Sequence, residues 1–207
     1  MGLLSLLIDD PLVFILLAVP LLYSIILHEL AHGWVAYRMG DPTARSLGRL
    51  SLNPLKHLDP IGTLLLFLFG FGWAKPVPID VRNFRAPRKG FILVSAAGIA
   101  ANILLAFVAL LLLDLLYPLG SERLNYFLSA LALVNITLAA FNLIPIPPLD
   151  GSKILMGLTS GPFLKLMLSL ERYGFIILVA LLYFGALDPV IRALRLGIWS
   201  VITTLLP

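Results

Sequence analysis

Long apolar stretches separated by short polar ones make up most of the chain. The first, "PLVFILLAVPLLYSIIL" at residues 11–27, carries no charge, and the pattern predicts a helix from about Pro11 to Met39. About 20 such residues are enough to cross the hydrocarbon core of a membrane. On this criterion the segment from 190 to 206 is either a further span or a helix at the membrane surface. The clearer predicted spans lie at about residues 11–39, 90–116, 124–144 and 163–187.

The pattern changes between the first two spans. Residues 61–72 ("IGTLLLFLFGFG") are apolar, but so short a helix rises only about 18 Å, so the segment is expected to be re-entrant or a membrane-embedded hairpin. Val77, Ile79 and Val81 then alternate with proline or polar residues, which is typical of a strand, and the prolines restrict such a strand to a sheet edge. The expected fold is an all-α polytopic membrane protein with about five to six membrane helices and a short re-entrant or β-hairpin segment near residues 61–82.

Composition supports a membrane protein and limits its chemistry. The 207 residues are 60% hydrophobic and only 13% charged, with a mean hydropathy of +1.01, whereas soluble domains carry about a quarter charged residues. Little sequence remains outside the apolar stretches, so residues 1–207 are expected to form a single membrane-embedded domain. The absence of cysteine excludes disulfides and thiolate ligands, and leaves nitrogen and oxygen atoms to bind any metal.

The net charge of +4 reflects basic residues gathered in loops. Two such loops flank the short segment at 61–72, and because that segment cannot cross, both are expected on the cytoplasmic side. The chain is thus predicted to be a multi-pass protein of the cell membrane with its N-terminus outside. This distribution requires no nucleic-acid partner. The first helix has no basic region before it and no small-residue cleavage site after it, so a retained span is expected rather than a signal peptide.

Two histidines and a glutamate interrupt the first helix, in "HELAH" at residues 28–32. His28 and His32 are four residues apart, which places both imidazoles on one helical face within reach of a single cation. In such a site the histidines bind zinc and Glu29 removes a proton from the attacking water. Short matches also occur by chance in unrelated helices. Ionisable residues within a spanning helix are costly unless they are paired or functional, so the membrane setting favours the metal site.

A hydrolytic zinc ion needs three protein ligands and an open position, and without cysteine the third is His, Asp or Glu. His57, in "NPLKHLDP", is one candidate, although a histidine in a basic loop is more often a surface or capping residue. Asp150 follows the span that returns to the inner side, and His28 lies about 26 Å along the first helix. Both are therefore expected near the inner face. Gly151 lets the backbone turn tightly beside Asp150, although "DG" is also an ordinary loop turn.

Three motifs, "HELAH", "AAGIAAN" and "FNLIPIPPLDG", occur in this order in an all-membrane chain. Together they resemble the site-2 protease family of intramembrane zinc metalloproteases, in its compact bacterial and archaeal form without accessory domains. "SLNPLKHLDPIGT" is also similar to the loop after the first helix of compact bacterial members, so the likeness extends over residues 11–155. The resemblance implies one zinc ion per chain bound by His28, His32 and Asp150, with Glu29 as general base and acid.

The same resemblance implies that two asparagines also belong to the site. Asn142, eight residues before Asp150, would lie near the scissile carbonyl, where an amide N–H can help to hold the developing oxyanion. The alternative is an asparagine that bonds within its helix. Asn102, in "GIAAN", is a candidate substrate-binding residue, but Ile99 stands where the family commonly has proline. Gly98 and the alanines around it are also typical of close helix packing.

The expected activity is hydrolysis of peptide bonds within or next to transmembrane segments of single-span membrane proteins in the lipid bilayer, known as regulated intramembrane proteolysis. A substrate helix must unwind before cleavage, and an exposed strand edge would pair with the unwound form. Val77, Ile79 and Val81 are candidate substrate-binding residues on this edge. The main alternative is a membrane transporter that passes a cation or protons through the same cluster, although no inverted repeat is visible. A different membrane metalloprotease would need a distal glutamate, and only Glu122 and Glu171 lie beyond the pentad.

Overall fold

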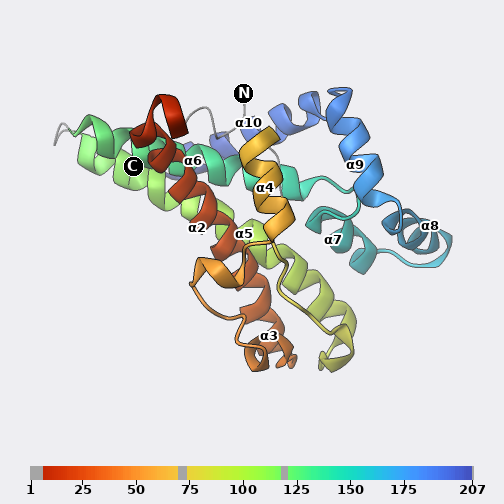
Figure 1. The fold of residues 1–207 in the computed structure, drawn as a ribbon. Helices are drawn as coiled ribbons and strands as arrows, with labels where there is room; N and C mark the ends of the chain where they lie inside the picture. Colours follow the sequence, from red (N-terminus) through yellow and green to blue (C-terminus); the bar gives the residue numbers. More distant parts are fainter. Residues whose placement is uncertain (1–6, 70–73, 118–120, 207) are drawn as a thin grey trace.

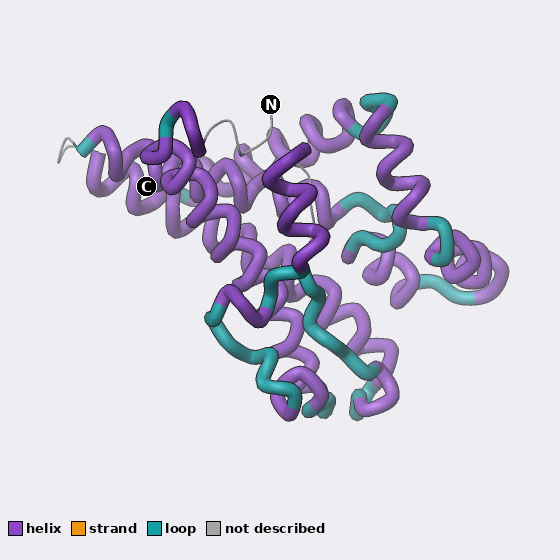
Figure 2. The backbone as a smooth tube through the Cα atoms, in the orientation of Figure 1, coloured by secondary structure: helices purple, strands orange, loops and turns teal. Residues whose placement is uncertain are grey.

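The described part of the chain is almost entirely helical. A computed structural model describes residues 7–69, 74–117 and 121–206, and Figures 1 and 2 show their helices and connecting loops. Three helices are long and apolar enough to cross a membrane, which confirms the first three predicted spans. They are α2 (Pro11–Met39), α5 (Pro87–Leu116) and α6 (Glu122–Leu143).

Local chemistry sets both ends of α2. Asp10 caps the start by accepting a hydrogen bond from the Val13 N–H at 3.0 Å, and Pro11 fits the first turn, where no intrahelical N–H bond is required. The helix ends at Gly40, whose φ of 112° lies in the left-handed region that favours glycine. The tripeptide "GDP" therefore ends the helix where the sequence predicts.

Helix α5 is the central element of the bundle. It packs against α2, α6 and the short helix α7 (Asp150–Leu158). Where α5 meets α6, small residues such as Ala106, Ala109 and Ala132 are buried, and Ile202 of α10 (Asp188–Leu205) completes this apolar cluster. Small side chains let the helices approach closely, and this approach brings polar residues of different helices within bonding distance.

The C-terminal part departs from the predicted span at 163–187. It forms α8 (Gly161–Glu171) and α9 (Gly174–Tyr183), which are bent by 76° at the break between them. A Cβ on Gly174 would lie 2.6 Å from the carbonyl oxygen of Pro147, so the bend brings α9 tightly against the linker before α7. This pair adds a fourth candidate span only if it is one broken span, and α10 is not a candidate among the described residues. Five to six membrane helices are therefore not confirmed.

Short elements fill the region between α2 and α5, namely α3 (Thr43–Ser46), η1 (Pro54–Lys56), α4 (Pro60–Phe69) and η2 (Val81–Asn83). Helix α4 has ten residues, too few to cross a membrane. An isolated antiparallel bridge between Leu58 and Ala74 joins the two flanks of this segment. The chain therefore leaves and returns at one place, as a re-entrant segment would, but the described residues contain no hairpin of strands. Residues 70–73 of the predicted segment lie outside the described residues.

The strand predicted through Val77, Ile79 and Val81 is wrong. Residues 75–80 are extended without a partner strand among the described residues, and Val81 begins η2. The prolines of this segment have no N–H to donate, and the Val77 N–H donates to Glu29 Oε2 at 2.8 Å. Side-chain acceptors thus take the place of a neighbouring strand.

Asp41 holds the far end of this extended segment. Its carboxylate accepts hydrogen bonds from the Asp80 N–H and the Asn83 side-chain amide, both at 2.8 Å, and also from Thr43. Burial raises the pKa of Asp41, but the bonds from Thr43, Asn83 and Asp80 outweigh this effect and hold the pKa below its ordinary value. The segment is therefore fixed to the end of α2 by a carboxylate that stays ionised.

Candidate metal centre

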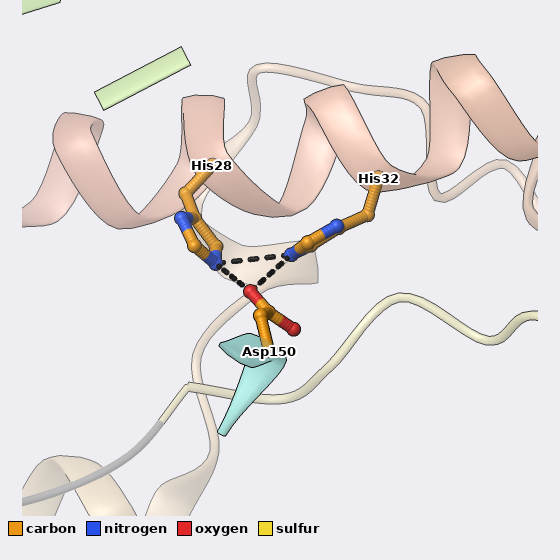
Figure 3. Close-up of side chains that lie close together, drawn as sticks. All are labelled: His28, His32 and Asp150. Atoms are coloured by element: carbon orange, nitrogen blue, oxygen red, sulfur yellow. Dashed lines mark hydrogen bonds and ion pairs between the residues drawn. The ribbon is translucent and has the colours of Figure 1, made fainter. Parts of the chain in front are cut away.

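His28, His32 and Asp150 meet in a buried cluster (Figure 3). The histidines lie on one face of α2 and the aspartate is the first residue of α7. The two Nε2 atoms are 3.0 Å apart, and Asp150 Oδ2 lies 3.1 Å from Nε2 of His28 and 3.0 Å from Nε2 of His32. The three residues are 7%, 6% and 4% exposed. The structure thus brings together the three ligands that the sequence indicated.

The hydrogen bonds made by the two Nδ1 atoms leave the Nε2 lone pairs of both histidines facing the centre of the cluster. His28 Nδ1 lies 2.6 Å from Asn102 Oδ1, and His32 Nδ1 lies 2.7 Å from the carbonyl oxygen of Val94. Both partners are acceptors, so Nδ1 carries the proton in each ring and Nε2 presents a lone pair. Neither Nε2 can then donate to Asp150 Oδ2, which is buried without a hydrogen bond.

Three acceptor atoms that converge without a donor repel one another unless a cation lies between them. Nitrogen and oxygen ligands at about 2.0–2.1 Å from a tetrahedral zinc ion are about 3.3 Å apart, close to the spacing of 3.0–3.1 Å found here. The donor set of two imidazoles and one carboxylate is typical of zinc sites that keep an open position for water. The residues therefore fit a zinc ion.

Helix α5 supports the histidines from behind with a stripe of residues at four-residue spacing. Val94 accepts from His32 and Asn102 accepts from His28, which makes α5 antiparallel to α2. Gly98 lies between them, where a Cβ would come within 2.5 Å of atoms in both rings. The small residues in "AAGIAAN" thus serve close packing, and at Gly98 the packed atoms belong to His28 and His32.

Asp150 is held in place by its neighbours in α7. Gly151 lies so close to the end of α6 that a Cβ would be 2.3 Å from the carbonyl oxygen of Leu143. This confirms the need for glycine beside the ligand, although the reason is close approach of the backbone rather than a positive φ. Lys153 Nζ donates to Asp150 Oδ1 at 3.2 Å. Oδ2 is thereby left for the histidines.

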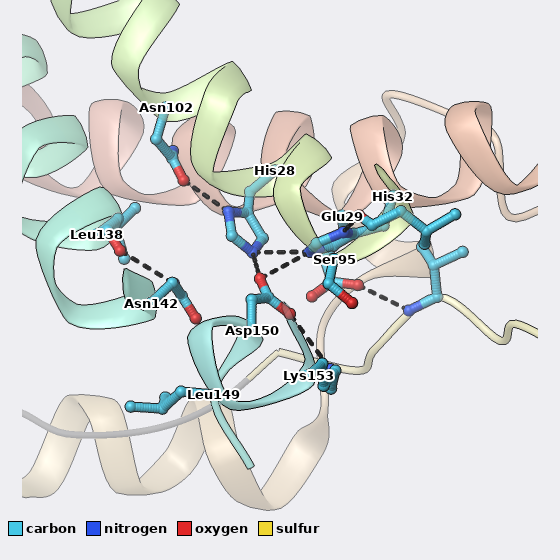
Figure 4. Close-up of polar contacts among 12 residues, drawn as sticks. His28, Glu29, His32, Ser95, Asn102, Leu138, Asn142, Leu149, Asp150 and Lys153 are labelled. Carbon is cyan, nitrogen blue, oxygen red and sulfur yellow. Dashed lines mark hydrogen bonds and ion pairs between the residues drawn. The ribbon is translucent and has the colours of Figure 1, made fainter. Parts of the chain in front are cut away.

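A cavity of about 550 Å³ opens beside the cluster, and Glu29, Asn142, Val77 and Ile79 line it. Glu29 Oε2 accepts the Val77 N–H at 2.8 Å, so the main chain holds one of its carboxylate oxygens. Asn142 Nδ2 donates to the carbonyl oxygen of Leu138 at 3.0 Å, within its own helix (Figure 4). The second N–H of this amide remains for another acceptor.

Two residues singled out in the sequence do not line the cavity. His57 is buried elsewhere, where Nε2 lies 2.7 Å from the carbonyl oxygen of Ser51, so it is not the third member of the cluster. Asn102 is fully buried behind His28 (Figure 4), so it contacts the ligand and not the cavity. Lys153 was missed, although its spacing of three residues from Asp150 on a helix could have indicated the contact.

Comparison with known proteins finds relatives that are named as putative zinc metalloproteases. Residues 118–184 match the model of the family described as Peptidase family M50. The chain is 45% identical over 172 residues to "Putative zinc metalloprotease YwhC" of Bacillus subtilis, covering 80% of this chain and 78% of that protein. It is 34% identical over 184 residues to "Putative zinc metalloprotease Rip2" of Mycolicibacterium smegmatis, with coverage of 85% and 70%. It is 31% identical over 168 residues to "Putative zinc metalloprotease MJ0611" of Methanocaldococcus jannaschii, with coverage of 80% and 81%. No solved structure matches significantly.

Proposed function

Because this chain belongs to peptidase family M50 and is a zinc metalloprotease, we propose that it hydrolyses peptide bonds within or next to transmembrane segments of single-span membrane proteins. The observation that carries this proposal is the burial of the metal-binding cluster among apolar helices. The histidines are in the interior of α2, and their supporting residues are on α5. Both helices are long and apolar enough to cross a membrane. A substrate bond would have to come to them within the bilayer.

The proposed roles follow from the geometry around the cavity. His28, His32 and Asp150 would hold the zinc ion, which would supply Lewis-acid polarisation and a lowered pKa of water. Glu29 would take a proton from the attacking water and give it to the leaving amine. The Val77 N–H orients its carboxylate for this transfer. Asn142 would donate its remaining N–H to the substrate carbonyl oxygen as negative charge develops there.

The extended segment before η2 would bind the unwound substrate. Val77 and Ile79 line the cavity, and the N–H and carbonyl oxygen of Ile79 have no hydrogen-bond partner among the described residues. An unwound substrate could therefore pair with these main-chain groups while its scissile bond reaches the cluster. Val81 lines the same cavity, and Asn102 would act only through His28.

We further propose that the site opens near the cytoplasmic side of the cell membrane. The basic loops on either side of α4 support this placement through the positive-inside rule. The transporter alternative has no support in the family to which the chain belongs, and the convergence of three lone pairs on one point suits a fixed metal ion better than a pathway.

The decisive experiment combines metal content with cleavage. Zinc per purified chain is measured for the wild type and Glu29→Gln, together with cleavage of a panel of single-span substrates. The expected result is about one zinc per chain in both, with cleavage lost only in Glu29→Gln, because the base is removed while the ligands stay. Glu171→Gln, which changes an exposed acid, is the matched control. Cleavage of soluble peptides but of no membrane-embedded substrate would contradict the intramembrane activity.

A further inference from the structure

A chain of buried hydrogen bonds leads away from His28 into the core of the helix bundle. Asn102 Nδ2 donates to Asn135 Oδ1 at 2.8 Å, and Asn135 Nδ2 donates to Ser24 Oγ at 2.7 Å. These three side chains come from α5, α6 and α2, and each residue is 0% exposed. Neither Asn135 nor Ser24 lines the cavity, so neither can touch a substrate.

A main-chain acceptor beside Asn135 fixes which atoms donate and which accept in this series of hydrogen bonds. Asn135 Nδ2 also lies 2.8 Å from the carbonyl oxygen of Leu131, which can only accept, so the atom facing it must be the amide nitrogen. Asn135 Oδ1 is then the acceptor that faces Asn102. Asn102 must therefore turn its nitrogen to Asn135 and its oxygen to His28. The carbonyl oxygen of Ser24, 3.4 Å from Asn102 Nδ2, favours the same orientation.

The orientation of the Asn102 amide determines which ring nitrogen of His28 is free. With Oδ1 facing it, His28 Nδ1 carries the proton and Nε2 offers its lone pair to the metal cluster. If the amide were reversed, its N–H would favour the other tautomer, and a proton on Nε2 would block ligation. The orientation of the buried Asn102 amide thus decides whether His28 Nε2 has a lone pair available for a metal ion.

We propose that Asn135 and Ser24 are positioning residues that lock the Asn102 amide and, through it, the tautomer and ring position of His28. The inference rests on the proposed zinc ligation by His28. Partners of metal-ligating histidines commonly affect metal affinity by about 10–100-fold. Asn135 acts one bond further away, so its effect belongs at the low end of that range.

The test measures the half-time of zinc release to a chelator from purified protein. Asn102→Leu is expected to speed release by about 10–100-fold and Asn135→Leu by up to about 10-fold. The double variant should release zinc no faster than Asn102→Leu alone, because Asn135 acts only through Asn102. Thr137→Val is the matched control, because it removes an exposed hydroxyl of α6 that bonds only within the helix.

Ser24→Ala provides a smaller perturbation in case loss of the Asn135 amide prevents folding. It removes the Oγ acceptor and should speed zinc release in the same direction as Asn135→Leu, by a smaller factor. Cobalt-substituted protein gives a second readout, because a changed ligand field at His28 shifts its absorption bands while a purely structural change leaves them in place. Additive effects of Asn102→Leu and Asn135→Leu, or unchanged release in both Ser24→Ala and Asn135→Leu, would overturn the inference. A wild type that holds no zinc would instead defeat the proposed site itself.

Discussion

Adding one methyl group at Gly98 tests the metal centre without removing any polar atom. In Gly98→Ala the new Cβ would lie 2.5 Å from His28 Cε1, 2.5 Å from His32 Nε2 and 2.6 Å from His28 Nε2. Favourable contacts between such atoms are about 3.5–4.0 Å. Each ring, or the helix carrying it, must therefore move by about 1 Å.

A displacement of this size affects the metal far more than the fold. Zinc sites hold their ligand distances to within about 0.2 Å, so a shift of about 1 Å is several times the tolerance. Overpacking of a buried site typically lowers the free energy of unfolding by about 1–3 kcal/mol, which most folded chains survive. Misplacement of reacting groups by about 1 Å costs about 100-fold in rate. Gly98→Ala should therefore fold, lose most of its zinc and lose cleavage by at least that factor.

The assay compares zinc per chain, thermal unfolding in detergent and cleavage of one membrane substrate. Gly197→Ala is the matched control, because a Cβ there meets no atom within 4 Å, and it should match the wild type in zinc and cleavage. A well-folded Gly98→Ala protein with one zinc per chain and wild-type cleavage would refute the reasoning. The rings would then be elsewhere, or the cluster would not be the metal site.

Further predictions concern the metal, pH, substrate and topology. Chelation should lower the unfolding temperature of the wild type, because it leaves three acceptors facing one another, and should have little effect on Asp150→Ala; equal effects would contradict this. The folded pKa of Asp41 is depressed, so its contribution to stability is full above the unfolded value of about 3.9 and is lost as the pH falls through the folded value; Asp41→Asn should therefore flatten the loss of unfolding temperature measured below about pH 4. Val81→Pro should reduce cleavage with zinc retained, because proline is tolerated at the start of η2 but cannot pair with substrate; unchanged cleavage would remove Val81 from the substrate site. In this cysteine-free chain, a cysteine at Ser121 should react with an impermeant maleimide added outside cells, and one at Leu55 should react only after lysis; the reverse labelling would invert the topology.

The sequence predicted the elements whose signal is local. A long uncharged stretch ended by "GDP" defined α2, because helix length and termination depend on neighbouring residues. The bend between α8 and α9 was missed although Glu171 and Arg172 interrupt the apolar pattern there, because the packing of Gly174 on Pro147 that accompanies the bend is a long-range contact. The strand at Val77 to Val81 failed for a related reason. Alternation predicts an extended chain, but the acceptors for its N–H groups turned out to be side chains.

The metal cluster was predictable because the histidines within one span and the aspartate just after another had to lie at one depth. The same rule applies to Ser24, Asn102 and Asn135, each of which interrupts an apolar stretch in a different span. A buried polar side chain costs free energy unless it finds a partner, and within apolar helices the available partners are the other polar side chains. Their existence as a set could therefore have been inferred. Which atom donates to which could not, because it depends on the rotation of three helices and on the Leu131 carbonyl, which any residue at that position would supply.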